Sequence, residues 1–134
     1  MRIIIGGAGR VGTELARALR AEEMDVVLVD SDSRAVKNAQ NLDVLVIHGD
    51  LTTREKLHEA GIGEAEIFVA ATNSDERNLL ACALAEHAHQ QFGGAKAKPL
   101  MSISRVRSMN FMQEQKQGHL TIFIRRDYLK RIFV

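Results

Sequence analysis

Residues 1–32 read MRIIIGGAGRVGTELARALRAEEMDVVLVDSD, and this stretch decides the fold. A short apolar strand leads into a glycine turn, an amphipathic helix follows, and a second apolar strand ends at Asp30. The turn has the spacing G-x-G-x-x-G, formed by Gly7, Gly9 and Gly12. A carboxylate about twenty residues after such glycines completes the fingerprint of a dinucleotide site.

Each glycine has its own physical role in this fingerprint. Gly7 allows a sharp turn off the strand, Gly9 lets a pyrophosphate approach the backbone, and Gly12 lets the helix pack close to the strand. The first N–H groups of the helix and the positive end of its dipole are expected to face the phosphates. Asp30 is expected to accept hydrogen bonds from the adenosine ribose. Its charge predicts a preference for NADH over NADPH, although Arg34 leaves some room for a 2′-phosphate.

Composition bounds the class of protein. The 134 residues are enough for one domain, and 46% of them are hydrophobic. A net charge of +1 gives no general affinity for nucleic acid, and a single cysteine, Cys82, forms no disulfide framework. No apolar run has membrane-spanning length and no secretory signal is visible, so a cytoplasmic, non-spanning protein is expected.

Strand and helix patterns alternate along the whole chain. Strands are expected at 3–5, 26–29, 44–48, 67–71, 100–104 and 120–124, and helices at 11–19, 34–41, from a Thr52–Glu55 capping box to about 61, from 73–75 to about 91, at 106–117 and from 127 onward. The first four strands are apolar on both faces, as in a parallel sheet covered on each side. We therefore expect one α/β domain over residues 1–134. It should be a three-layer, doubly wound Rossmann fold with six parallel strands in the order 3-2-1-4-5-6.

Ligands of such a fold lie beyond the carboxyl ends of the strands, where several polar residues follow their strands. Asp50 suits either the edge of an adenine pocket or the cap of the next helix. Thr72 suits a phosphate or a second ribose, or else a turn, and Arg105 at the mouth of the fifth strand suits a bidentate phosphate contact. Arg10, inside the glycine turn, also lies near any bound phosphate.

Neither catalysis nor metal binding is indicated by the side chains. No nucleophile with a paired base is visible, and the five histidines lack the spacing of a metal site. Cys82 lies in an apolar helical run, where packing is its expected role.

Five segments resemble, in chain order, the TrkA N-terminal domain, which is also called the RCK or KTN domain. They are IIIGGAGRVGTELARAL, VVLVDSD, VIHGDLTTREKLHEAGI, EAEIFVAATNSDERNLLACALA and ISRVR, and together they cover nearly the whole chain through Arg107. The most specific parts are Gly49-Asp50, the segment 71–76 with Asn78, and Arg105. The match is weak from residue 108 to 118, and the Arg125-Arg126 pair is more basic than the family pattern.

The resemblance implies a non-catalytic regulatory domain that binds NAD(H) or an adenine nucleotide such as ATP or ADP. It implies homodimers or larger rings at the inner face of the membrane, beneath a potassium channel or transporter. The family's ligand positions correspond to Gly7, Gly9, Arg10, Val11, Asp30, Asp32, Asp50, Leu51, Thr72, Asn73 and Arg105. Two alternatives are the cofactor-binding domain of an NAD-dependent oxidoreductase and an oligomerisation module with a vestigial site.

The end of the chain carries an apolar helical stripe. Tyr128, Leu129, Ile132 and Phe133 fall at i, i+1, i+4 and i+5, and a monomer would leave these side chains in water unless the helix folded back over its own sheet. The resemblance favours burial of the stripe against a second subunit, so we expect a homodimer or a larger ring.

Overall fold

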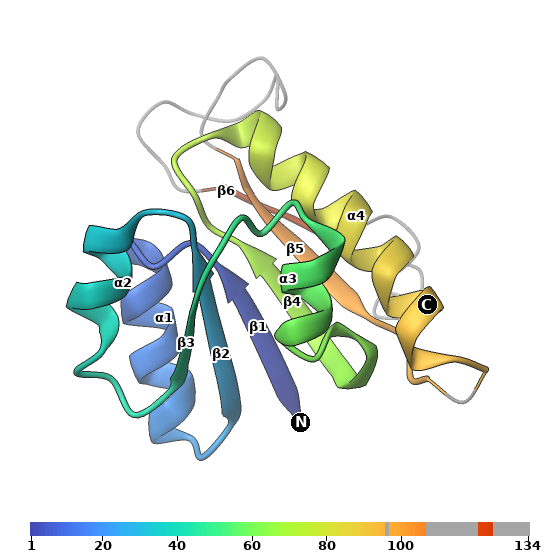
Figure 1. Ribbon diagram of the computed structural model, residues 1–134, viewed down its shortest axis with the longest axis horizontal. Coiled ribbons are helices and arrows are strands. Elements are labelled where there is room, and N and C mark those ends of the chain that lie inside the picture. Colours follow the sequence, from blue (N-terminus) through green and yellow to red (C-terminus); the bar gives the residue numbers. More distant parts are fainter. Residues whose placement is uncertain (96, 107–120, 125–134) are drawn as a thin grey trace.

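A computed structural model describes residues 1–95, 97–106 and 121–124 of the chain (Figure 1). The strands are β1 (Arg2–Gly6), β2 (Asp25–Asp30), β3 (Leu45–His48), β4 (Ala65–Ala70), β5 (Met101–Val106) and β6 (Thr121–Ile124). The helices are α1 (Arg10–Ala21), α2 (Ser33–Ala39), α3 (Arg54–Glu59), the 3-10 turn η1 (Ile62–Glu64) and α4 (Asp75–Gly93). The six strands form one sheet in the order β3-β2-β1-β4-β5-β6, which confirms the expected Rossmann order.

Two apolar layers cover the sheet, one on each face (Figure 1). The central strand β1 contributes to both, because Ile3 and Ile5 point to the layer of α1 and α2 while Ile4 points to the layer of α3 and α4. Phe68 of β4 is fully buried under α4, and Cys82 packs in the same cluster, so the packing role expected for the cysteine is confirmed. These two layers hold the carboxyl ends of β1, β2 and β4 in fixed positions.

The sixth strand does not run parallel to the others. β1 to β5 pair in parallel, but β6 pairs antiparallel to β5, with Val106 opposite Thr121. The prediction of six parallel strands is therefore wrong at this edge. A parallel partner would require the chain to cross back to the opposite end of the sheet, whereas β6 begins beside the residue at which β5 ends. An antiparallel edge strand is common on an otherwise parallel sheet.

The N-caps of α3 and α4 are single side chains, and the cap of α3 differs from the one that the sequence predicts. The cap of α3 is Thr53, whose side chain accepts from the Lys56 N–H, and not Thr52. The cap of α4 is Ser74, among the residues expected to start that helix, and it accepts from the Arg77 N–H. Of the helix expected at 106–117, the structure describes only Val106 and places it in β5. Residues 107–117, the helix expected from 127 onward and the stripe of Tyr128, Leu129, Ile132 and Phe133 lie outside the described residues.

Among the described residues, no helix combines the length and the apolar character that a bilayer crossing requires.

Candidate nucleotide site

A cavity of about 500 Å³ lies at the carboxyl ends of the strands, and we call it the crest cavity. It lies where such a sheet binds ligands, at the point where the strand order reverses from β1. Its lining consists of Gly7, Gly9, Arg10, Val11, Asp30, Ser31, Asp32, Ala35, Leu51, Ala71, Thr72, Asn73, Arg77 and Arg105. Every site residue expected from the sequence is in this set except Gly12 and Asp50.

The glycine turn has the geometry that its spacing predicts. Gly7 has φ +117°, and a Cβ on it would lie 2.9 Å from the carbonyl carbon and oxygen of Ala71. A Cβ on Gly12 would overlap the carbonyl oxygen of Gly7, so this glycine permits the close approach of α1 to the turn. Gly9 differs from both, because it has φ −80° and nothing lies within 4 Å of a Cβ built on it. Gly9 thus leaves an open approach to the backbone, while the other two serve packing.

Asp30 organises the turn that it faces. Its Oδ2 accepts the backbone N–H of Ala8 at 2.7 Å, and its Oδ1 accepts the backbone N–H of Asp32 at 2.8 Å. The carboxylate therefore joins the glycine turn to the loop that follows β2, in addition to any contact with a ribose. A carboxylate oxygen has two lone pairs, so each oxygen retains capacity for a ligand hydroxyl.

A buried asparagine fixes the other side of the cavity. Asn78, in the first turns of α4, is fully buried. Its Oδ1 accepts from both the N–H and the hydroxyl of Thr72, at 2.9 and 2.6 Å, and its Nδ2 donates to the carbonyl oxygens of Thr72 and Arg105, at 3.1 and 2.9 Å. One side chain thus sets the loop after β4 and the end of β5 relative to each other.

Asp50 lies in the turn before α3 and outside the cavity lining. Its Oδ1 accepts from the N–H and the hydroxyl of Thr52, at 2.9 and 2.7 Å, and from the guanidinium of Arg77 at 2.8 Å. The two hydrogen bonds from Thr52 are the main cause of a pKa for Asp50 below its usual 3.8. Burial opposes this shift, and the charge and hydrogen bond of Arg77 add to it. The predicted role of Asp50 as the cap of the next helix is wrong, because Thr53 caps α3 and Asp50 instead holds the turn before it. Its role at the edge of an adenine pocket stays a prediction.

Arg77 is a cavity residue that the sequence analysis missed. It comes from α4, 27 residues along the chain from Asp50, and no local motif signals their contact. Ala35 and Ala71 were missed as well, although they neighbour predicted residues. Cationic groups dominate the charge of the lining, because Arg10, Arg77 and Arg105 stand against the carboxylates of Asp30 and Asp32. An anionic ligand suits this balance.

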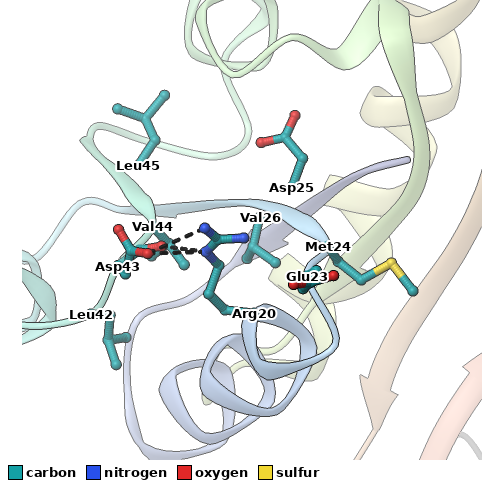
Figure 2. Close-up of a pocket in the computed structure, with 9 residues that line it drawn as sticks. All are labelled: Arg20, Glu23, Met24, Asp25, Val26, Leu42, Asp43, Val44 and Leu45. Carbon is teal, nitrogen blue, oxygen red and sulfur yellow. Dashed lines mark hydrogen bonds and ion pairs between the residues drawn. The ribbon is translucent and has the colours of Figure 1, made fainter.

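A hollow at the opposite, amino end of the strands has a different chemistry (Figure 2). Figure 2 shows Arg20 turned toward Asp43, and these side chains form an ion pair at 3.2 Å. The first residues of β2 and β3 form part of the wall of this hollow, and among them Leu45 is half exposed. Three carboxylates, those of Glu23, Asp25 and Asp43, line this hollow against one arginine, so its charge is opposite in sign to that of the crest cavity.

Comparison with protein families identifies the domain. The model of the TrkA-N domain matches residues 3–117. The chain belongs to the TrkA-N domain family. The family expected from the glycine turn, the Gly49-Asp50 segment and the segment 71–76 is thereby confirmed.

Several TrkA proteins are similar in sequence to this chain. The chain is 36% identical over 116 residues to the Trk system potassium uptake protein TrkA of Haemophilus influenzae, covering 86% of this chain and 24% of that protein. It is 44% identical over 88 residues to a TrkA homolog of Pyrococcus abyssi, covering 65% of this chain and 39% of that protein. The chain therefore spans well under half the length of these relatives.

Solved structures agree on the fold. The Kef CTD of Shewanella denitrificans in its AMP-bound form is 27% identical, with a TM-score of 0.57 over 69% of this chain and 54% of that one. The NAD(P)-binding domain of an exopolyphosphatase-related protein from Archaeoglobus fulgidus is 19% identical, with a TM-score of 0.66 over 98% of this chain and 92% of that one. The second likeness shows a shared Rossmann-type fold across almost the whole chain.

Proposed function

We propose that this domain binds an adenine nucleotide, NAD(H) or ATP/ADP, in the crest cavity and reports it to a potassium uptake system. One observation carries the proposal: in a TrkA-N domain, a single cavity is lined by the open backbone at Gly9, by Asp30 and by Arg105. The similarity to TrkA proteins and to an AMP-bound Kef domain supports both the ligand class and the transport role.

The cavity suits a sensor because its walls come from two parts of the sheet. Gly9 and Asp30 belong to the β1–β2 part, whereas Thr72 and Arg105 belong to the β4–β5 part, held together by Asn78. A nucleotide that contacts both parts favours the arrangement of the loops that fits it best. Control of transport then requires that the nucleotide bind one assembly state more tightly than another.

The transport partner in this proposal is a membrane-embedded potassium channel or transporter. The domain lies on the cytoplasmic side, peripheral to the membrane, as a homodimer or a larger ring with Leu129, Ile132 and Phe133 in the contact. Light scattering on the parent and on a Leu129→Asp, Phe133→Asp double variant tests the assembly. A parent that stays monomeric at high micromolar concentration would contradict it, as would a double variant that dimerises equally well.

The cavity chemistry favours regulation over an oxidoreductase role. Among the described residues that line the crest cavity there is no histidine, cysteine, tyrosine or lysine to handle a substrate proton. Its carboxylates at Asp30 and Asp32 accept backbone N–H groups. We expect no turnover of NADH with small carbonyl substrates, and steady turnover lost on mutation of a crest residue would contradict the regulatory role.

Calorimetry with NADH and with ATP tests the site on a matched pair of variants. Gly9→Leu adds a side chain at a backbone conformation open to any residue, in space that the proposal gives to phosphate. Ala18→Leu adds a similar side chain at an exposed position of the same helix, outside the cavity lining. We expect Gly9→Leu to weaken both nucleotides by at least about tenfold, a change of about 1.4 kcal/mol, and Ala18→Leu to leave them unchanged. A folded Gly9→Leu protein with unchanged affinity for both would show that phosphate does not bind here.

A further inference from the structure

A second groove, of about 380 Å³, adjoins the crest cavity between α1 and α2, and we call it the arginine groove. Gly9, Arg10, Asp32 and Ala35 line both spaces, so the two are continuous at the glycine turn. The groove is also lined by Ala8, Thr13, Arg17, Arg34, Asn38, Asn41 and Leu42. Arg10, Thr13 and Arg17 lie on one face of α1, at spacings of three and four residues, and Arg34 and Asn38 lie four residues apart on α2.

Two arginines of this groove, Arg17 and Arg34, differ in their partners from several arginines elsewhere. Arg2, Arg20 and Arg77 each form an ion pair with an aspartate, at 2.9, 3.2 and 2.8 Å. In the part of the chain that the structure describes, no ion pair or side-chain hydrogen bond engages the guanidinium of Arg17 or of Arg34. Two guanidinium groups that have no partner among the described residues therefore lie in one groove beside the candidate nucleotide site.

The groove also carries an excess of positive charge. Arg10 contacts Glu14 at 3.5 Å with its side chain 90% exposed, which is a weak pair. Asp32 is the one carboxylate in the described lining, and its Oδ1 accepts the backbone N–H of Arg34. Three arginines therefore stand against one carboxylate. Guanidinium groups bind phosphate through paired N–H donors, so a phosphate group is the ligand that this lining matches best.

We propose that the arginine groove receives a phosphate carried on the adenosine ribose, so that the domain accepts the 2′-phosphorylated dinucleotide NADPH. The inference rests on the proposed function, because it takes the ribose to lie at Asp30. Asp32, two residues further along the chain, lines both the crest cavity and the groove. A ribose held at Asp30 therefore has the groove beside it, with Arg34 on the groove wall.

The carboxylate of Asp30 opposes a 2′-phosphate less than its charge alone suggests. Both of its oxygens already accept backbone N–H groups, from Ala8 and from Asp32. These dipoles offset part of the negative charge that a phosphate would meet. We therefore expect no preference for NADH over NADPH, although the position of Asp30 predicts one from the sequence.

Calorimetry on the full chain at one low ionic strength tests the groove, with NADH, NADPH, ADP and 2′,5′-ADP as probes. We expect the parent to bind NADPH at least as tightly as NADH. Arg34→Ala and Arg17→Ala should each weaken NADPH and 2′,5′-ADP by roughly tenfold and change NADH and ADP by less than about twofold. Arg20→Ala is the matched control, because this arginine lies on the same helix as Arg17 but pairs with Asp43 at the far end of the sheet (Figure 2).

The possible outcomes distinguish failure of the groove proposal from failure of the proposed nucleotide site. Binding of NADH or ADP by the parent, with NADPH ten times weaker and insensitive to Arg34→Ala, overturns the groove and leaves the nucleotide site intact. An equal loss of NADH and NADPH in the arginine variants also overturns it, since the arginines would then serve the shared phosphates. Binding of ATP is a further arm: if Arg34→Ala weakens ATP as much as NADPH, the groove serves a polyphosphate tail, and this outcome overturns the 2′-phosphate site. A parent that binds none of these nucleotides contradicts the proposed function as well.

Discussion

The side-chain oxygen of Asn78 accepts two hydrogen bonds from Thr72, from its N–H at 2.9 Å and from its hydroxyl at 2.6 Å. The amide nitrogen of Asn78 donates in turn to the carbonyl oxygen of Arg105. Asn78 has no exposed surface, so removal of its amide leaves these groups without the buried partner that the fold provides. The wall of the crest cavity on the β4–β5 side therefore depends on one buried amide.

Asn78→Ala should lower the free energy of unfolding by about 2–4 kcal/mol, because it leaves the Thr72 and Arg105 backbone groups buried without their partner. Asn78→Asp should also destabilise the fold, since a carboxylate cannot donate to the two carbonyl oxygens. Urea denaturation measures both changes. Asn38→Ala, at an exposed position, is the control and should shift stability by less than about 0.5 kcal/mol. A fully stable Asn78→Ala protein would show that the loop after β4 is set by other contacts.

The parts of the site that the sequence predicted are those that depend on local spacing. Gly7, Gly9 and Gly12 follow from the geometry of one strand-to-helix turn, and Asp30 follows from the end of the next strand. The order of the strands likewise follows from alternating strands and helices.

The parts that were missed depend on contacts between distant segments. Arg77 meets Asp50 across 27 residues, and the Asn78 amide meets the Arg105 carbonyl across the same separation. Periodicity describes neither contact, because each joins α4 to a distant segment that only the folded sheet brings close to it. The direction of β6 is a similar case, since an apolar strand pattern has no information about which way the strand runs beside β5.

Two glycine substitutions in the same turn should have different effects on stability. Gly12→Ala should lower the free energy of unfolding by about 1–3 kcal/mol or more, because its Cβ overlaps the carbonyl oxygen of Gly7 and forces α1 to move. Gly9→Ala should cost less than about 1 kcal/mol, as expected for an alanine at a helix N-cap with no steric conflict. Thermal and urea denaturation of the two variants gives the comparison. Equal destabilisation would mean that close helix packing is not the role of Gly12.

Asp30→Asn tests whether this carboxylate organises the glycine turn before any ligand binds. The substitution replaces one acceptor with an NH₂ group, which then faces the backbone N–H of either Ala8 or Asp32. We expect a loss of about 1–2 kcal/mol in stability without nucleotide and faster amide hydrogen exchange at Ala8 or Asp32. Asp43→Asn is a suitable control, because its carboxylate is exposed and contacts only a side chain. Unchanged exchange at both amides would restrict Asp30 to a role in ligand binding.

The last prediction concerns pH and the turn held by Asp50. Because folding lowers the pKa of Asp50 below 3.8, its ionised form stabilises the fold at neutral pH, and this contribution is lost as the pH falls through the lowered value. The side chains of Asp50 and Arg77 are 41% and 45% exposed, so solvent screening limits the ion pair to less than about 1 kcal/mol.

Carbon-13 NMR titration of the Asp50 carboxyl measures this pKa in the parent protein and in the Thr52→Val and Arg77→Met variants. Thr52→Val should raise it the most, since the hydroxyl of Thr52 is the main cause of the shift, and Arg77→Met should raise it by less. The effect of Arg77→Met should shrink as salt is added, because that contribution is largely coulombic, whereas the effect of Thr52→Val should persist. A larger effect from Arg77→Met than from Thr52→Val would show that the ion pair, and not the local turn, controls Asp50.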